Sequence, residues 1–216
     1  MGVQKRLKKI KCIGFDMDGT LYPETKEIQD FKKELLCKCL VEKDKISFSE
    51  AREIRDREFA KTGSYTCVLK HHGIEDTNKI INDKGHNNQL IKLIRFDPGL
   101  EKFLKKIKKK YKTFLVTHTN KKYAVPRMSK AGINYQDCFD VCIFGDSGLL
   151  KTSREVFDLA LSKLNFKPEE VLYVGDRETV DIVVPKKIGM LTIMVGSNSS
   201  LADYRLDSIY DLPNIL

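Results

Sequence analysis

The segment 13–21 reads IGFDMDGTL, in which an apolar run stops at two aspartates, Asp16 and Asp18. The residues before Asp16 are apolar on both faces, as in a strand that lies inside a parallel sheet with both faces covered. Gly19 and Thr20 follow directly, and a glycine gives the backbone the freedom to turn sharply after a strand. The segment therefore predicts a buried strand whose carboxyl end carries two acidic side chains.

Further apolar runs of the same kind occur at residues 113–117, 141–144, 171–174 and 191–195. Helical patterns separate these runs, including 121–131, which ends at Gly132, and 180–188, which ends at Gly189. Pro185 is expected to kink or shorten the last helix. Strands that alternate with helices are typical of a parallel sheet with crossover helices. The sequence thus predicts an α/β fold with a doubly wound parallel sheet.

A second acidic loop occurs in the segment 171–181, VLYVGDRETVD, where Asp176 and Asp181 follow an apolar run. Ligands of open α/β sheets bind outside the carboxyl ends of the strands. We therefore expect these two aspartates to meet Asp16 and Asp18 at one rim of the sheet. Crowded carboxylates repel one another, and Mg²⁺ takes oxygen ligands, commonly carboxylates together with phosphate. The sequence predicts a magnesium site there.

Residues at two other strand ends would complete a site for a phosphoryl group. Thr117 ends the second run and can donate a hydroxyl hydrogen bond, and Lys151 follows the third run after a short loop. Nucleophile, metal, hydroxyl and ammonium groups together stabilise the charge of a transferring phosphoryl group. His118 follows Thr117, and we expect it either to offer its backbone N–H or to titrate in the substrate pocket.

The stretch 22–95 differs from the rest of the chain. It is rich in Lys, Glu, Asp and Asn, and it shows successive helical patterns without a convincing strand. Ser47 and Glu50 form a capping box ahead of one of these helices. The predicted domains are therefore a sheet-containing core of residues 1–21 and 96–216 and a helical insert of residues 22–95.

The composition and charge of the chain indicate where the protein resides and what class of partner it binds. No apolar run approaches the ~20 residues that span a bilayer, and the apolar part near the N-terminus is too short for a signal peptide. We expect a cytoplasmic protein without membrane contact, as a monomer or small homo-oligomer. The net charge of +9 favours an anionic partner. Because part of this charge lies on the solvated face of an amphipathic helix at 101–112, a small phosphorylated metabolite is favoured over nucleic acid.

Taken together, these motifs resemble those of the haloacid dehalogenase superfamily, across almost the whole chain. The segment 16–20, DMDGT, is similar to the first motif of that superfamily, Thr117 to the second, Lys151 to the third and residues 175–181 to the fourth. The helical insert resembles its smaller cap domain. The resemblance implies a Rossmann-like core with strand order 5-4-1-2-3, bound magnesium and an aspartyl-phosphate intermediate.

By motif position, the resemblance implies that Asp16 attacks phosphorus and that Asp18 acts as general acid and then as general base. Thr117 and Lys151 would hold the phosphoryl oxygens, with His118 beside them in the place where the second motif usually has asparagine. A leaving alkoxide needs a proton. Dehalogenases of the superfamily lack an acid at the position of Asp18, so dehalogenation is disfavoured.

The resemblance also implies which residues would hold magnesium. They are Asp16, the backbone carbonyl of Asp18, and Asp176, with Asp181 as a ligand through water or as a support for the others. The implied activity is a magnesium-dependent phosphatase acting on small phosphate monoesters of the nucleotide, sugar phosphate or phosphoglycolate class.

Some alternatives stay open. The segments 20–23 and 62–65 resemble pyrimidine 5′-nucleotidases. A phosphomutase would use the same aspartate pair but would return the phosphoryl group to a bound sugar instead of to water. A basic module that binds nucleic acid or another partner, with a vestigial acidic site, is the non-enzymatic alternative; its binding would weaken steeply as salt rises.

Overall fold

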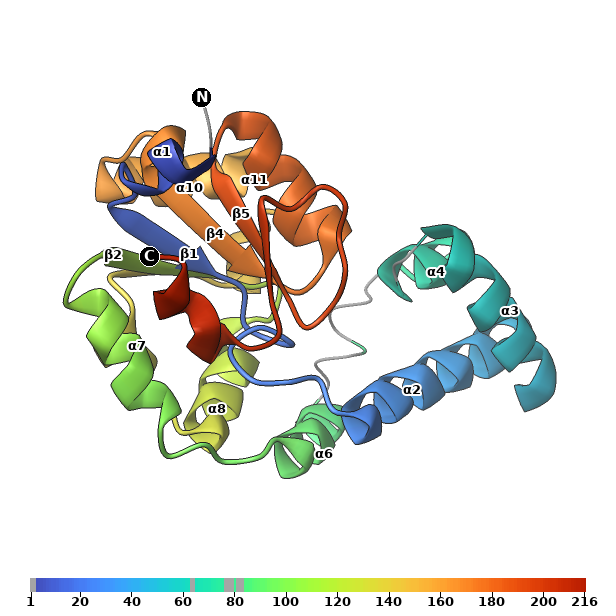
Figure 1. Cartoon of the computed structure of the whole chain (residues 1–216). Coiled ribbons are helices and arrows are strands. Elements are labelled where there is room, and N and C mark those ends of the chain that lie inside the picture. The colour runs from blue at the N-terminus through green and yellow to red at the C-terminus, as the bar shows by residue number, and fades with distance from the viewer. Residues whose placement is uncertain (1–2, 63–64, 76–79, 81–83) are drawn as a thin grey trace. The chain divides into compact units, whose positions relative to one another are not determined.

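The chain forms two compact units, Met1–Glu24 together with Ile94–Leu216, and Thr25–Leu93. The computed structural model describes residues 3–62, 65–75, 80 and 84–216. In this part of the chain, every strand belongs to the first unit, and the second unit consists of helices and their connections (Figure 1). Within the same residues, no helix is both long enough and apolar enough to cross a membrane.

The first unit is built on a six-stranded sheet in the order β3-β2-β1-β4-β5-β6, with every neighbouring pair parallel. The strands are β1 (Cys12–Phe15), β2 (Lys112–Val116), β3 (Val141–Ile143), β4 (Val171–Gly175), β5 (Leu191–Val195) and β6 (Tyr204–Leu206). The predicted doubly wound sheet is confirmed, and so is the order of the five expected strands. The short edge strand β6 was not predicted.

Helices cover both faces of this sheet, with α10 and α11 on one face and α7 and α8 on the other (Figure 1). The α-helices of the unit are α1 (Val3–Leu7), α7 (Leu100–Lys108), α8 (Lys121–Ala131), α9 (Tyr135–Cys138), α10 (Glu155–Leu164) and α11 (Val183–Ile188). The 3₁₀ turns are η1 (Gly145–Ser147), η2 (Pro168–Glu170) and η4 (Ile209–Asn214). Because helices shield both faces, every residue of β1, β4 and β5 is buried.

The helix predicted at 180–188 is shorter than expected. Residues Glu178–Ile182 form a π-helical turn, η3, and the α-helix begins only at Val183. Pro185 therefore lies in the first turn of α11, where a missing N–H leaves no hydrogen bond of the helix unmade. The π-helical turn carries Asp181, so the departure from a regular helix occurs at a candidate site residue.

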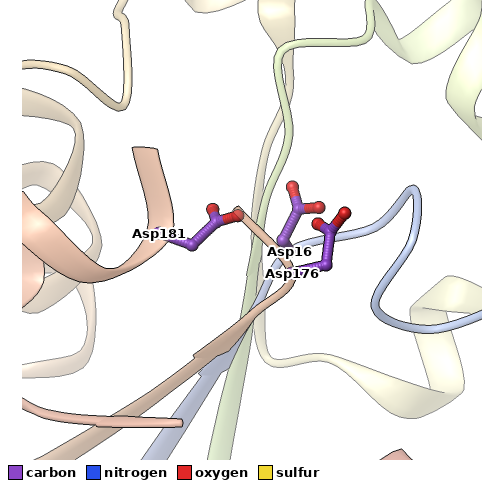
Figure 2. A group of neighbouring side chains, drawn as sticks. All are labelled: Asp16, Asp176 and Asp181. Carbon is purple, nitrogen blue, oxygen red and sulfur yellow. The ribbon is translucent and has the colours of Figure 1, made fainter. Parts of the chain in front are cut away.

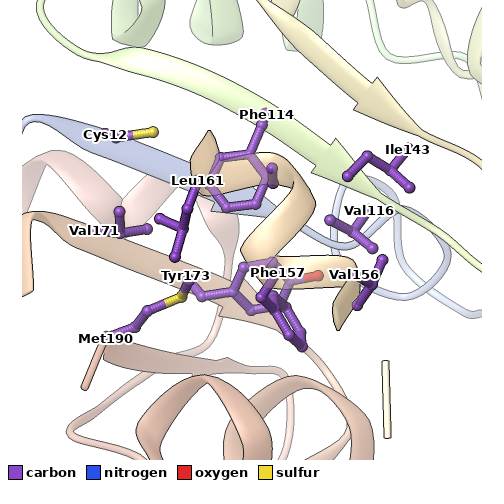
Figure 3. Close-up of a cluster of buried hydrophobic side chains, with 11 residues drawn as sticks. Cys12, Phe114, Val116, Ile143, Val156, Phe157, Leu161, Val171, Tyr173 and Met190 are labelled. Carbon is purple, nitrogen blue, oxygen red and sulfur yellow. The ribbon is translucent and has the colours of Figure 1, made fainter. Parts of the chain in front are cut away.

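Aromatic rings fill the layer between the sheet and α10 (Figure 3). The Tyr173 ring, on β4, meets the Phe157 ring edge-on, with ring centroids 5.1 Å apart. It also meets the Phe114 ring of β2 at 6.0 Å. Aromatic pairs at such distances add to the free energy gained from burial of the rings. This packing holds β1 between two rigid neighbours and so fixes the strand end that carries Asp16.

The second unit contains α2 (Lys26–Asp44), α3 (Phe48–Thr62), α4 (Tyr65–His71) and α6 (Lys84–Leu93). The predicted capping box is confirmed, because the Ser47 N–H donates to Glu50 Oε2 at 2.8 Å and the Glu50 N–H donates to Ser47 Oγ at 3.2 Å. The hydrophobic core of this second unit contains Leu36, Cys37, Leu40, Ala51, Val68 and Leu69. Two residues of the segment compared with pyrimidine 5′-nucleotidases, Gly63 and Ser64, lie outside the described residues.

Candidate active site

Three aspartates converge at the carboxyl ends of β1 and β4 (Figure 2). Asp16 comes directly after β1, and Asp176 directly after β4; these strands are paired, with Phe15 in register with Val174. The π-helical turn brings Asp181 back to the same place. One carboxylate oxygen from each aspartate lies within 4.8 Å of the others. The sequence-based expectation that these three acids meet is therefore confirmed.

Two glycines make room for these carboxylates. Gly19 has φ +86°, in the left-handed region that favours glycine, and a Cβ there would lie 2.2 Å from Asp176 Oδ2. A Cβ on Gly175 would lie 2.2 Å from the Cβ of Asp181. Atoms cannot approach so closely. The sequence places a glycine at both points because the backbone itself forms a wall of the site.

Lys151 is fully buried beneath the aspartates. Its Nζ donates to Asp16 Oδ1 in a short hydrogen bond and to Asp181 Oδ1 at 2.6 Å. Desolvation alone would lower the pKa of Lys151, yet the Asp16 and Asp181 carboxylates outweigh it and raise that pKa. Lys151 is therefore a charged ammonium group held in place by two carboxylates.

Two of these carboxyl groups, Asp16 and Asp176, have raised pKa values. Burial raises the pKa of Asp16, and Lys151 opposes the shift. Burial, together with the neighbouring Asp16 and Asp181, raises the pKa of Asp176 to about 8. Among the described residues, Asp16 Oδ2 is a buried oxygen without a hydrogen-bond partner. An uncompensated buried oxygen beside a second carboxylate fits a hard divalent cation, which prefers oxygen ligands and stabilises their anionic form.

Thr117 and His118 both lie at the carboxyl end of β2. The Thr117 Oγ1 accepts a hydrogen bond from the Thr119 N–H at 3.1 Å. The His118 Nε2 accepts one from the Lys151 backbone N–H at 2.8 Å, so it joins the loop after β2 to the loop that carries Lys151. Burial, and then the positive charge of Lys151, lowers the pKa of His118 to about 4. His118 is therefore neutral near neutral pH, and the expectation that it titrates there is not met.

The lowered pKa of His118 makes a prediction about stability. The unfolded chain takes up this proton near the ordinary value of 6.5, and the folded chain only near about 4. Unfolding is thus favoured as pH falls through that window. Between about pH 7 and about pH 5, we expect the wild type to lose about 1–2 kcal/mol more unfolding free energy than His118→Gln. Urea unfolding at both pH values measures this difference.

His71→Gln, at an exposed histidine outside the site, is the matched control for the replacement itself and should unfold like the wild type at about pH 7. Equal pH dependence in the wild type and His118→Gln would show that His118 takes up its proton as readily in the folded chain as in the unfolded chain.

The Asp18 carboxylate has partners that sequence reasoning missed. Asp18 Oδ1 accepts a hydrogen bond from the Tyr22 hydroxyl at 2.5 Å, and Oδ2 accepts one from Thr119 Oγ1 at 3.2 Å. Arg127 of α8 lies 3.4 Å from Oδ2 through its Nη1. No signal in the sequence ties an arginine in the middle of a helix to this loop. The loop position of Tyr22, four residues after Asp18, is the only local cue.

Arg177 was also missed. It follows Asp176 directly, just beyond the carboxyl end of β4. Desolvation would lower the pKa of Arg177, but the carboxylates of Asp181, Asp16 and Asp176 raise it overall. The site therefore has a second positive charge near its carboxylates, in addition to Lys151.

The chain is similar to known proteins over most of its length. A family model of haloacid dehalogenase-like hydrolases matches residues 10–189, a range that contains every candidate site residue described above. A curated relative, the glyceraldehyde 3-phosphate phosphatase of Methanocaldococcus jannaschii, is 27% identical over 227 aligned residues. That alignment covers 96% of this chain and 97% of the relative.

Solved structures share the fold. A phosphatase of the haloacid dehalogenase type from Thermococcus onnurineus has a TM-score of 0.68 and 24% identity, with 95% of this chain and 97% of that chain covered. A haloacid dehalogenase-type hydrolase of Bacillus subtilis, described as bound to magnesium, has a TM-score of 0.63 and 19% identity, with 96% and 98% covered.

Proposed function

The chain belongs to the haloacid dehalogenase-like hydrolase family, as one of its phosphoric monoester hydrolases, and we propose that it hydrolyses small phosphate monoesters through an aspartyl-phosphate on Asp16 with Mg²⁺ as cofactor. The observation that carries this proposal is the cluster of Asp16, Asp176 and Asp181 around the buried ammonium group of Lys151. Such a cluster combines an anionic nucleophile, oxygen ligands for a cation and a fixed positive charge.

In the proposed mechanism, Asp16 attacks phosphorus and the substrate oxygen leaves with a proton from Asp18. Asp18 then removes a proton from the water that hydrolyses the acyl phosphate. Lys151 holds Asp16 in position and, with Thr117, binds the phosphoryl oxygens. When bound, Mg²⁺ would neutralise charge on the phosphoryl group and on the carboxylates.

The proposed metal ligands are Asp16, the backbone carbonyl of Asp18, and Asp176. The unpartnered Asp16 Oδ2 and the raised pKa of Asp176 support this set. Asp181 supports the site from behind, because its Oδ1 accepts from Lys151 and its Oδ2 accepts from the Arg177 N–H at 3.1 Å. His118 is proposed to position Lys151 beside the substrate.

For the substrate, we propose a small sugar phosphate, with triose phosphates first. The named activity of the Methanocaldococcus jannaschii relative supports this class. Arg177 and Lys151 place two positive charges near the carboxylates, as an anionic substrate requires. We also propose that the unit Thr25–Leu93 is a cap that selects the substrate, because the chain leaves for it at Glu24, soon after the Asp18 loop.

The experiment is a panel of phosphate esters assayed for phosphate release with magnesium present. It includes glyceraldehyde 3-phosphate, phosphoglycolate, hexose phosphates, 5′-nucleotides and p-nitrophenyl phosphate. We expect phosphate release to have the highest kcat/KM with the small sugar phosphates. In a chain with Thr25–Leu93 replaced by a Gly/Ser linker, p-nitrophenyl phosphate should still be cleaved while discrimination among the metabolites is lost.

If the intact 216-residue chain releases phosphate from none of the esters, p-nitrophenyl phosphate included, the proposed function is refuted. An unchanged order of preference in an active linker variant would refute the cap alone.

A further inference from the structure

Both oxygens of the Asp18 carboxylate are held by side chains from three separate parts of the chain. Oδ1 accepts from the Tyr22 hydroxyl at 2.5 Å, and Oδ2 accepts from Thr119 Oγ1 at 3.2 Å. Arg127 Nη1 lies 3.5 Å from Oδ1 and 3.4 Å from Oδ2. Because Tyr22 and Thr119 donate to different oxygens, turning this side chain away from its observed orientation would lose at least one of these hydrogen bonds.

The three partners are themselves buried and connected. Tyr22 is 5% exposed, Thr119 6% and Arg127 2%. Arg127 Nη1 also donates to Thr119 Oγ1 at 3.4 Å, so the arginine braces the hydroxyl that reaches Asp18. Tyr22 is fixed by its own loop, where the Gly19 N–H donates to the Tyr22 carbonyl at 3.1 Å. The cluster thus has little freedom to rearrange.

Stability alone does not account for a buried arginine at this place. Removing a guanidinium from water is unfavourable, and an apolar side chain of similar volume often gives equal or greater stability than a buried ion pair. The Arg127 side chain nonetheless lies beside the Asp18 carboxylate. The hydrogen bonds described for Lys151 go to Asp16 and Asp181 instead. The unfavourable free energy of burying the Arg127 guanidinium is consistent with a role of Arg127 in holding the Asp18 carboxylate.

We infer that Tyr22, Thr119 and Arg127 are positioning residues that hold the Asp18 carboxylate in one orientation for proton transfer to and from the substrate. This inference rests on the proposed function, in which Asp18 is the acid and base. Proton transfer in the transition state requires the donor within hydrogen-bond reach of the leaving oxygen. A carboxylate that is fixed beforehand loses no rotational freedom when the substrate binds.

The test compares two kinds of leaving group. An alkoxide leaving from a sugar phosphate or from glycerol phosphate needs a proton, whereas p-nitrophenolate leaves as a stable anion. We therefore expect Tyr22→Phe and Arg127→Met to lower kcat/KM for the alkyl phosphate about 10- to 100-fold, within the range that a general acid provides. For p-nitrophenyl phosphate we expect a decrease of less than about 3-fold. Arg127→Lys, which keeps the charge, should recover part of the loss.

Asp18→Asn is the reference variant, with an expected loss of about 10²–10⁴-fold for the alkyl phosphate. Adding Tyr22→Phe to Asp18→Asn should cause no further loss, because the hydroxyl acts through the carboxylate. The matched controls are Tyr210→Phe, which removes the hydroxyl donated to Asp97 at 2.7 Å, and Arg154→Met, which removes an exposed pair with Asp158. Both should keep wild-type values for both substrates.

The outcomes distinguish the role of Asp18 as an acid from the role of Tyr22, Thr119 and Arg127 in positioning it. If Asp18→Asn lowers kcat/KM equally for both leaving groups, the acid role of Asp18 fails and this inference fails with it. If Asp18→Asn discriminates between the substrates but Tyr22→Phe does not, the positioning role alone is refuted. Tyr22→Phe keeps the ring and its packing, so it remains informative if Arg127→Met does not fold.

Discussion

Asp16→Asn is expected to abolish turnover, by at least about 10⁴-fold, while the protein stays folded. The amide keeps the shape of the side chain but is a poor nucleophile and a weak ligand for a cation. The fold should survive because Lys151 Nζ keeps its hydrogen bond to Asp181 at 2.6 Å. Phosphate release with magnesium and the thermal unfolding midpoint together measure this result.

Trapping the covalent phospho-enzyme identifies the residue that carries the phosphoryl group and so tests the same prediction directly. Wild-type protein quenched in acid during turnover should carry phosphate on the peptide that contains Asp16, and Asp16→Asn should carry none. Asp158→Asn, at a partly exposed aspartate of α10 that pairs with Arg154, is the control and should be labelled like the wild type. Label on a different residue, or near-full activity of Asp16→Asn, would contradict the assignment of the nucleophile.

Removal of divalent metal is expected to abolish activity just as completely, with recovery when magnesium is added back. Binding of a cation to the folded state alone also raises the thermal unfolding midpoint. Because the pKa of Asp176 is raised to about 8, this carboxyl group is largely protonated at lower pH when no metal is bound. Metal binding should therefore release a proton, and the affinity should fall as pH falls below about 8.

Calorimetric titration of magnesium in buffers with different ionisation enthalpies measures the released proton without relying on activity. Asp176→Asn is the informative variant, since it should bind magnesium more weakly and release fewer protons. Activity that persists after thorough chelation, or magnesium binding that does not change from about pH 6 to about pH 8, would contradict the metal assignment.

Much of the sheet was predictable because its strands are apolar on both faces. The stretch at 191–195 was recognised to the residue, and so was the end of the first strand just before Asp16, since a buried parallel strand leaves a continuous apolar signal. Edge strand β6 leaves none, because only Leu206 of its three residues is buried. The π-helical turn was missed for a different reason, since the spacing of apolar residues does not distinguish i→i+5 hydrogen bonds from the i→i+4 bonds of a regular helix.

The acidic part of the site was predictable because its residues follow strands directly. A strand end fixes where the next residue lies, so Asp16 and Asp176 could be placed from the sheet alone. Arg127 and Thr119 were not predictable, because their contact with Asp18 depends on how α8 packs against the loop after β2. The neutral state of His118 likewise follows from burial and from its contact with Lys151, which only the folded chain displays.

Gly19 and Gly175 have a consequence at the level of the gene. Every other encoded amino acid carries a Cβ, and at these two codons that atom would lie 2.2 Å from Asp176 Oδ2 or from the Cβ of Asp181. No missense change is therefore conservative there, whatever its chemical similarity to glycine. We therefore expect any amino-acid replacement at either codon to disturb the aspartates of the site and to reduce activity.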